Sequence, residues 1–244
     1  MTNKKLTGRV ASDRIRMQST PKPPPGTVAR FTALGDCAGI ILDAMDELQI
    51  PSGVIGASVL RTTMPGRVTC GPALTVRNIP QRADPLAGAK ASVNLMAEFE
   101  AHNLAEEGDV LVVQGVSGMS NMGGISAQTG KRQGERGAIV MGDVRDIPHS
   151  RSVDYPIWSS EITPATGKWR LETVEINGTI EIFGVCVAAG DLVLADDTGV
   201  CFIPRDQILP VQSCAKRKAE HEEALSRAID NGLAVSEIFP LPKS

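Results

Sequence analysis

The amino-acid sequence predicts an α/β fold in one domain, with a central β-α-β core, an antiparallel β-rich second half and a C-terminal helix. Continuous apolar runs at residues 110–113 and 137–141 are typical of strands that are covered on both faces. A strand, a helix-length segment and a second strand at this spacing form a parallel pair with a right-handed crossover. Short strand-like runs follow residue 154, and a charged amphipathic segment spans residues 204–231.

The N-terminal segment predicts an extended arm over residues 1–26, followed by the α/β domain over residues 27–244. The arm is polar and ends in consecutive prolines, which favour polyproline II. Residues 1–30 hold seven Lys or Arg and one Asp. We expect this solvated basic arm to pack on a neighbouring subunit; a nucleic-acid-binding arm and a transit peptide are the alternatives.

Residue periodicity predicts the elements that precede the core. Apolar residues at helical spacing predict a helix over residues 27–48, broken at one of its internal glycines. Short β-branched runs predict strands at residues 54–60 and 68–76. Proline is favoured in the first turn of a helix, so Pro85 predicts a second helix that ends near residue 107.

Turn residues divide the second half of the domain into short strands. Asn177-Gly178 is a strong hairpin signal, because both residues accept the backbone angles of a tight turn. The strands are expected at residues 155–159, 172–176, 179–183, 192–195 and 200–203. The C-terminal helix is expected to stop at Gly232.

Composition narrows the class of function. The chain has 244 residues, of which 42% are hydrophobic and 22% charged, as in ordinary globular proteins. A net charge of −3 and 3% aromatic residues argue against nucleic-acid binding, which uses basic patches and stacking platforms. Five cysteines without a C-x-x-C pair indicate reduced thiols, and no apolar run is long enough to span a membrane. We therefore expect a cytoplasmic protein without a membrane partner.

Common catalytic motifs do not occur in this sequence. The glycine-rich stretch at residues 115–124 is neither a dinucleotide-binding fingerprint nor a Walker A motif, and H-E-x-x-H and G-x-S-x-G are absent. The histidines His102, His149 and His221 are scattered, and we expect each of them to be a surface or helix residue rather than a catalytic one.

An arginine and an acid follow the second core strand, where ligands bind in parallel sheets. Arg145 can hold planar oxygens with its guanidinium fork, and Asp146 can hold a hard divalent cation directly or through water. The glycine-rich loop leads into a helix that begins near Gly123-Gly124, and the N–H groups at a helix N-terminus attract anions. These residues suit a 2-oxo acid, although an Arg–Asp pair that merely caps a strand end explains them equally well.

The sequence resembles the RraA-like superfamily through motifs that cover most of the chain. They are Leu42-Asp43-Ala44-Met45, residues 70–76, 108–113, 123–127, 142–146 and 190–200. The superfamily includes class II pyruvate aldolases that act on 4-hydroxy-4-methyl-2-oxoglutarate and 4-carboxy-4-hydroxy-2-oxoadipate, and also the protein regulator of ribonuclease E. These motifs are specific for the superfamily and much less specific for the substrate.

The resemblance implies a divalent-metal-dependent lyase that forms a pyruvate enolate. It would cleave a 4-hydroxy-2-oxo acid by a retro-aldol reaction or decarboxylate oxaloacetate. By resemblance, Arg145 binds the substrate and stabilises the enolate, and Asp146 supports Mg²⁺ or another divalent cation such as Mn²⁺. The substrate carboxylate is expected at Gly123, Gly124, Ile125 and Ser126.

The resemblance also implies a homotrimer or a hexamer with active sites between subunits. Asp43 in the first helix and Glu223 (or Glu222) in the last helix would approach the site from a neighbouring subunit. The aldolases carry an acid twenty residues before this Arg-Asp pair, and Gly124 occupies that position here; Asp143 is the expected partial replacement. The alternative function is a non-catalytic, protein-binding trimer of the ribonuclease-regulator type.

Overall fold

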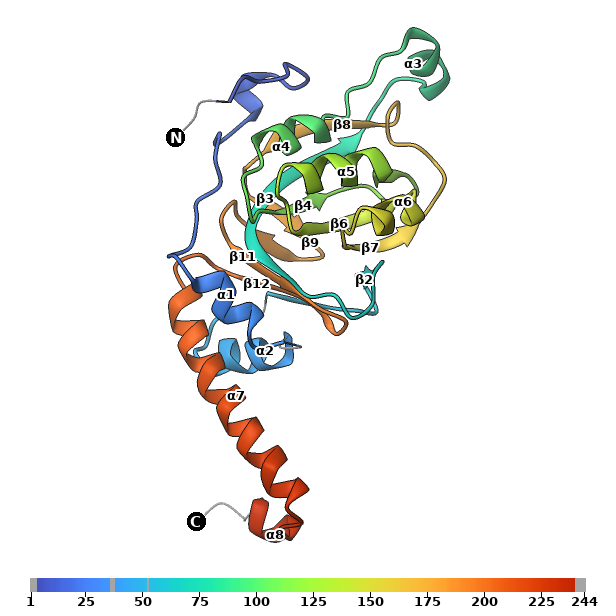
Figure 1. Ribbon diagram of the computed structural model, residues 1–244. Helices are drawn as coiled ribbons and strands as arrows, with labels where there is room; N and C mark the ends of the chain where they lie inside the picture. Colours follow the sequence, from blue (N-terminus) through green and yellow to red (C-terminus); the bar gives the residue numbers. More distant parts are fainter. Residues whose placement is uncertain (1–3, 36–37, 52, 240–244) are drawn as a thin grey trace.

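One mixed sheet organises the chain in the computed structural model (Figure 1). Within the described residues, 4–35, 38–51 and 53–239, ten strands join it in the order β1-β12-β11-β3-β4-β6-β7-β2, with β5 paired to β6 and β8 paired to β3. The strands are β1 (Val54–Gly56), β2 (Arg61–Thr62), β3 (Thr69–Pro80), β4 (Val110–Gln114), β5 (Ser120–Met122), β6 (Gly137–Val144), β7 (Ile157–Ile162), β8 (Leu171–Ile176), β11 (Leu192–Ala195) and β12 (Gly199–Ile203). A separate antiparallel pair joins β9 (Ile180–Ile182) to β10 (Val185–Val187).

The predicted β-α-β core is confirmed. β4 and β6 pair in parallel, with Val112 opposite Ile139, and α5 (Gly124–Arg132) lies in the connection between them. β3 pairs with β4 and β7 pairs with β6, both in parallel, so four neighbouring strands share one direction. Their carboxyl ends therefore meet at one edge of the sheet. Part of the glycine-rich loop, expected to be irregular, forms β5 against β6 at this edge.

Three helices cover one face of the parallel strands: α4 (Glu98–Leu104), α5 and α6 (Ile147–Ser152) (Figure 1). The core under them is apolar, and its members include Leu74, Ala101, Leu111, Ala127 and Val140. The opposite face of the same strands packs with the antiparallel half of the sheet around the fully buried Trp158. Because alternate side chains of a strand point to opposite faces, these strands present apolar side chains on both faces, and the three helices cover one of them.

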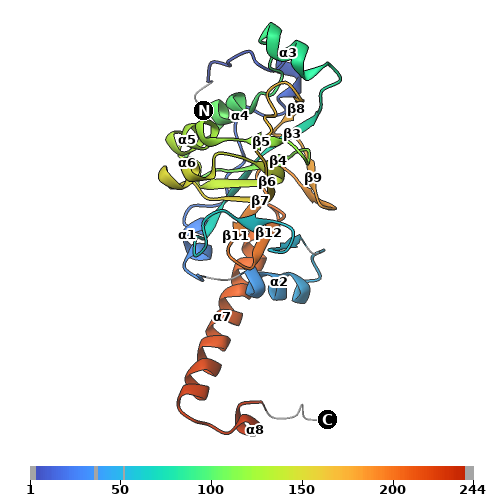
Figure 2. The same ribbon diagram turned by 90° about the vertical axis from the view of Figure 1, so that its right-hand side faces the viewer.

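A second group of helices packs on the antiparallel end of the sheet. It consists of α1 (Thr27–Thr32), α2 (Ala38–Glu47) and α7 (Ile208–Asp230), which share a core around Phe31, Ile41 and Val211. α7 then extends beyond the sheet, and α8 (Val235–Ile238) lies at its far end (Figure 2). In the part of the chain that the structure describes, no helix is long and apolar enough to cross a membrane.

Two predicted helices are each divided in two. The helix predicted over residues 27–48, with a break at Gly35 or Gly39, forms α1 and α2; the break at Gly35, which has a left-handed φ of 73°, is confirmed. The helix predicted over residues 85–107 becomes α3 (Pro85–Ala91) and α4, because Ser92 caps α3 with a left-handed φ of 56°. Backbone in this region cannot continue a right-handed helix, so the chain changes direction at each point.

The N-terminal arm, expected on a neighbouring subunit, lies against its own chain. Its hydrogen bonds and ion pairs with the domain include Thr7–Glu100, Arg14–Glu172, Arg16–Glu175 and Lys22–Asp109. Acidic groups of the domain thus partner three of the basic residues of the arm. Three described cysteines, Cys70, Cys201 and Cys214, are buried, and Cys37 lies outside the described residues.

Candidate functional site

Arg145 and Asp146 lie where β6 ends and α6 begins. The Arg145 backbone N donates to Met122 O at 3.1 Å, which ties this point to the end of β5. Asp146 has a left-handed φ of 58° and occupies the N-cap position of α6. Its Oδ2 accepts a hydrogen bond from Gly124 N at 3.1 Å and lies 3.5 Å from Arg145 Nε. The structure therefore brings Arg145, Asp146 and the first residue of α5 together.

The first turn of α5 offers backbone donors beside this pair. Gly123 is the N-cap residue and supplies no side-chain acceptor, so the N–H groups of Ile125 and Ser126 remain available for an anion. A Cβ at Gly123 would lie 2.9 Å from Asp146 Oδ2 and 3.2 Å from Arg145 Nε. Glycine at this position is therefore required for the Arg–Asp pair to approach the helix.

His149 occupies the space beside Gly124. A Cβ at Gly124 would lie 2.7 Å from both Cβ and Cγ of His149, which projects from α6. The imidazole Nε2 lies 3.1 Å from Gln128 Oε1 on α5. A side chain at position 124, where the resemblance places the acid of the aldolases, would thus overlap His149 unless α5 or α6 moved.

Asp143 lies on β6, where the pairing with β5 and β7 shifts its register. Its side chain is buried, and among the described residues its Oδ1 has no hydrogen-bond partner. The expectation that Asp143 partly compensates for Gly124 stays a prediction.

A cavity of about 620 Å³ opens beside Arg145 and Asp146. Its other walls are Ile147, Pro148, Arg151, Ile162, Thr163 and Pro164. Most of these side chains are apolar, and Arg145 and Arg151 supply the two positive charges. The cavity suits a small organic anion that has both carboxylate and apolar parts.

The acids expected from a neighbouring subunit line a second cavity, of about 400 Å³. Asp43 of α2 lines it together with Arg217, Lys218, His221 and Glu222 of α7. Glu223 instead pairs with Arg227 at 2.6 Å on the exposed face of α7. Of the two glutamates that the sequence left open, the structure places Glu222 next to Asp43. Figures 1 and 2 show α2 and α7 at the opposite end of the molecule from α5 and α6. Within one chain, Asp43 and Glu222 are therefore far from Arg145 and Asp146.

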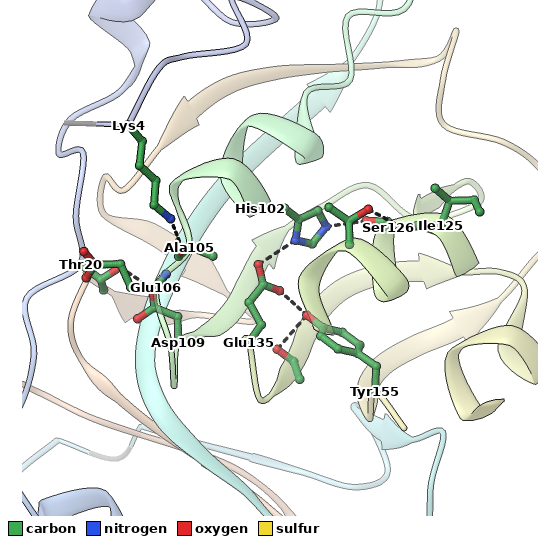
Figure 3. Close-up of polar contacts among 12 residues, drawn as sticks. Lys4, Thr20, His102, Ala105, Glu106, Asp109, Ile125, Ser126, Glu135 and Tyr155 are labelled. Carbon is green, nitrogen blue, oxygen red and sulfur yellow. Dashed lines mark hydrogen bonds and ion pairs between the residues drawn. The ribbon is translucent and has the colours of Figure 1, made fainter. Parts of the chain in front are cut away.

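A buried polar network that the sequence did not reveal joins α4 and α5 (Figure 3). His102 Nδ1 lies 2.7 Å from Glu135 Oε1, and His102 Nε2 lies 2.7 Å from Ser126 Oγ. The Tyr155 hydroxyl donates to Glu135 Oε2 at 2.5 Å. His102 was expected to be a surface or helix residue; it is a residue of α4, but it is 0% exposed. Its position close to the apolar residues Ala101 and Leu104 of the same helix was the sequence signal that could have indicated its burial.

The charge state of this network follows from its partners. Burial alone disfavours a charged imidazole, but the adjacent Glu135 carboxylate outweighs it, so the pKa of His102 is raised above its ordinary value. Burial, together with the Glu135 charge, raises the pKa of Tyr155 well above its ordinary range. Tyr155 therefore stays a neutral donor, and His102 keeps its proton to a higher pH than an exposed histidine does.

Comparison with known proteins identifies the family. A family model described as "RraA-like: Aldolase/RraA" matches residues 39–202, which include the β-α-β core and the Arg145–Asp146 pair. The chain belongs to the RraA-like family. The resemblance inferred from the sequence motifs is thereby confirmed, and the family's description covers both aldolases and RraA proteins.

Individual relatives match the chain at modest identity. Protein DlpA of Legionella pneumophila is 29% identical over 192 residues, which is 79% of this chain and 30% of DlpA. The chain thus spans less than a third of the length of DlpA. A Halalkalibacterium halodurans protein named "Putative 4-hydroxy-4-methyl-2-oxoglutarate aldolase" is 34% identical over 148 residues, 59% of this chain and 70% of that protein.

Solved structures confirm the fold. An uncharacterized protein from Pseudomonas syringae matches with a TM-score of 0.74 at 20% identity, over 89% of this chain and 98% of that chain. RraAS2 of Streptomyces coelicolor, described as an unusual member of the RNase ES inhibitor RraA family, matches with a TM-score of 0.71 at 26% identity, over 85% of this chain and 98% of its own.

Proposed function

We propose that the protein is a divalent-metal-dependent lyase that acts on a small 2-oxo acid. It cleaves a 4-hydroxy-2-oxo acid by a retro-aldol reaction, decarboxylates oxaloacetate, or does both, through a pyruvate enolate. The observation that carries this proposal is the convergence of Arg145, Asp146 and the first turn of α5 beside a cavity with two guanidinium groups. The relative from H. halodurans, with its aldolase name, supports the same reaction class.

The residues of this chain suggest how the substrate is held. The N–H groups of Ile125 and Ser126 bind the carboxylate next to the oxo group, and the dipole of α5 favours the negative charge. The Arg145 guanidinium lies against the oxo oxygen. When the C3–C4 bond breaks, its electron pair enters the C2–C3 bond of the enolate, and Arg145 stabilises the charge that develops on the oxygen.

Proton transfer completes the reaction. In the retro-aldol case the C4 hydroxyl loses its proton as C4 becomes a carbonyl, whereas in oxaloacetate C4 leaves as carbon dioxide. In both cases C3 of the enolate then takes a proton and pyruvate is released. Asp43 and Glu222 or Glu223, brought by a neighbouring subunit of a homotrimer or hexamer, are the proposed proton-transfer groups.

Asp146 fits a partly hydrated divalent cation. Its side chain is 49% exposed, and Oδ2 makes the contacts to Gly124 and Arg145, which leaves Oδ1 for a ligand. Mg²⁺ keeps several waters and binds through one or two carboxylates plus substrate oxygens, so a single carboxylate is sufficient. Among the residues described, no cluster of three or more His, Cys, Asp or Glu side chains is arranged around a metal. When bound, Mg²⁺ or Mn²⁺ supplies Lewis-acid polarisation of the oxo group.

A second candidate is a non-catalytic protein-binding role, as in the ribonuclease regulators. The observation that favours it is the close approach of His149 to Gly124, because an acidic side chain at position 124 would overlap the histidine. The similarity to RraAS2 supports the same alternative.

A coupled pyruvate-release assay with oxaloacetate and 4-hydroxy-4-methyl-2-oxoglutarate separates the two functions. We expect release that requires Mg²⁺, stops with chelator, and is lost in Arg145→Ala and in Asp146→Ala. The matched control is Arg67→Ala, which breaks a different Arg–Asp pair, with Asp154, at 2.5 Å on the surface. No release from either compound by the folded wild-type protein would overturn the lyase proposal in favour of the binding role.

A further inference from the structure

The buried network lies along one turn of α5. Ser126 and Gly130 are four residues apart and therefore share a face of the helix. His102 contacts Ser126, while a Cβ at Gly130 would overlap Glu135 Oε2 and lie 2.9 Å from the Tyr155 hydroxyl. The imidazole is thus at the first turn of α5, and the carboxylate is about one turn, or about 5.4 Å, further along. A charged His102–Glu135 pair points its positive end in the same direction as the helix dipole.

The charged groups around His102 reinforce this arrangement. Glu98, one turn earlier on α4, is buried, and its Oε2 has no hydrogen-bond partner among the residues that the structure describes. Arg9 of the arm and Lys168, which interact electrostatically with Glu98, are the cations on this side. On the other side Glu135 and Tyr155 are the titratable groups. His102 therefore lies between two carboxyl groups, and both favour the imidazolium.

The order Ser126–His102–Glu135 is that of a serine-hydrolase triad, but the burial excludes that chemistry. Ser126 is 3% exposed and His102 is 0% exposed, so a substrate cannot reach the Ser126 hydroxyl. When His102 is charged, its Nε2–H donates to Ser126 Oγ and fixes the side chain of the residue whose backbone N–H faces the anion site. The network acts on the site through Ser126.

We infer that His102 and Glu135, held by Tyr155, are positioning residues that align the first turn of α5 and strengthen its affinity for the carboxylate of a 2-oxo acid. This inference rests on the proposed function, since it takes the first turn of α5 as the carboxylate site. Neither residue touches the substrate; the effect is a fixed Ser126 and a positive field at the helix N-terminus.

The test is the affinity for oxalate, a planar anion that resembles the pyruvate enolate, measured by calorimetry with and without Mg²⁺ between pH 6 and pH 9. The double variant His102→Gln/Glu135→Gln keeps side chains that can hydrogen-bond but removes both charges. Ser126→Ala removes the contact to α5 and keeps the charged pair. The matched control is Glu100→Gln on the same helix α4, because Glu100 is buried and its hydrogen-bond partners among the described residues are Asn103 and the arm.

The expected results distinguish a positioning role from a structural one. Wild-type affinity should fall as the pH rises through the raised pKa of His102. The double variant should bind oxalate about 10-fold more weakly at pH 6, which corresponds to about 1.4 kcal/mol, and lose the pH dependence. Ser126→Ala should bind oxalate more weakly but keep the pH dependence, because the charged His102–Glu135 pair and its field remain, whereas Glu100→Gln should bind as wild type does.

Two different failures have different meanings. If the wild type binds oxalate and releases pyruvate while the double variant keeps the wild-type affinity and pH profile, or Ser126→Ala keeps the wild-type affinity, the inference is overturned and the lyase function stands. If the wild type binds no oxalate and releases no pyruvate, the carboxylate site itself is overturned, and the inference with it. Nuclear magnetic resonance titration of the three histidines adds a ligand-free check: a His102 that titrates at or below its ordinary pKa also overturns the inference.

Discussion

Replacing Gly124 by alanine tests the contact between α5 and α6. A Cβ there would lie 2.7 Å from His149 Cβ as well as from the ring. Because His149 Cβ is fixed to the backbone, rotation of the imidazole does not relieve the overlap, and one of the two helices must move. The effect on stability therefore has opposite signs in the presence and in the absence of the whole His149 side chain, Cβ included.

The magnitude follows from two competing terms. Overpacking a tight contact costs about 1–3 kcal/mol, whereas Gly→Ala in an unobstructed helix contributes about 0.5–1 kcal/mol of stability. We expect Gly124→Ala to lower the free energy of unfolding by about 1–2 kcal/mol in the wild-type background. In the His149→Gly background, which removes both overlapping atoms, the same substitution should raise it by about 0.5 kcal/mol.

Urea unfolding followed by circular dichroism measures both differences, and the double-mutant cycle gives the coupling between the two positions. The control is Gly39→Ala in α2, where an added Cβ meets no atom of the described residues within 4 Å. That substitution should be neutral or stabilising. A Gly124→Ala protein as stable as the wild type, with His149 intact, would refute the steric reasoning.

Three further predictions concern other parts of the chain. Glu135 raises the pKa of His102, so protonated His102 stabilises the folded protein fully below its unfolded-state pKa, and this stabilisation is lost as the pH rises through its folded-state pKa. The free energy of unfolding should therefore decrease over that pH interval. Urea titrations at several pH values measure this decrease, and His102→Gln should remove it. Arg151 lines the 620 Å³ cavity and is expected to bind the second carboxylate of a dicarboxylic 2-oxo acid. In steady-state kinetics, Arg151→Ala should therefore raise KM for such a substrate about 10-fold and leave kcat nearly unchanged. An unchanged KM would mean that the second carboxylate binds elsewhere. Asp109→Ala should release the arm, because Asp109 is buried and accepts hydrogen bonds from both Lys22 and Thr20. Limited digestion with trypsin should then cleave residues 1–26 of the variant faster than those of the wild type. Equal cleavage rates would contradict this role of Asp109.

Local sequence patterns were sufficient for much of the fold. The apolar runs that became β4 and β6 needed no other information, since a strand covered on both faces has few polar positions. Arg145 and Asp146 could be placed at the carboxyl ends of the parallel strands because they directly follow such a strand. Helix breaks were harder to predict: Ser92 takes a left-handed φ that its own side chain does not signal.

The sequence by itself determined the family, the parallel core and the Arg145–Asp146 pair at its edge. Only the tertiary structure showed that His149 closes the space beside Gly124, that Glu222 rather than Glu223 shares a cavity with Asp43, and that His102 reaches Ser126 and Glu135. The physical reason is that strand and helix periodicity depend on neighbours a few residues away, whereas these contacts join residues of different elements. Their geometry is set by the packing of α4, α5 and α6 on one sheet, which no local pattern records.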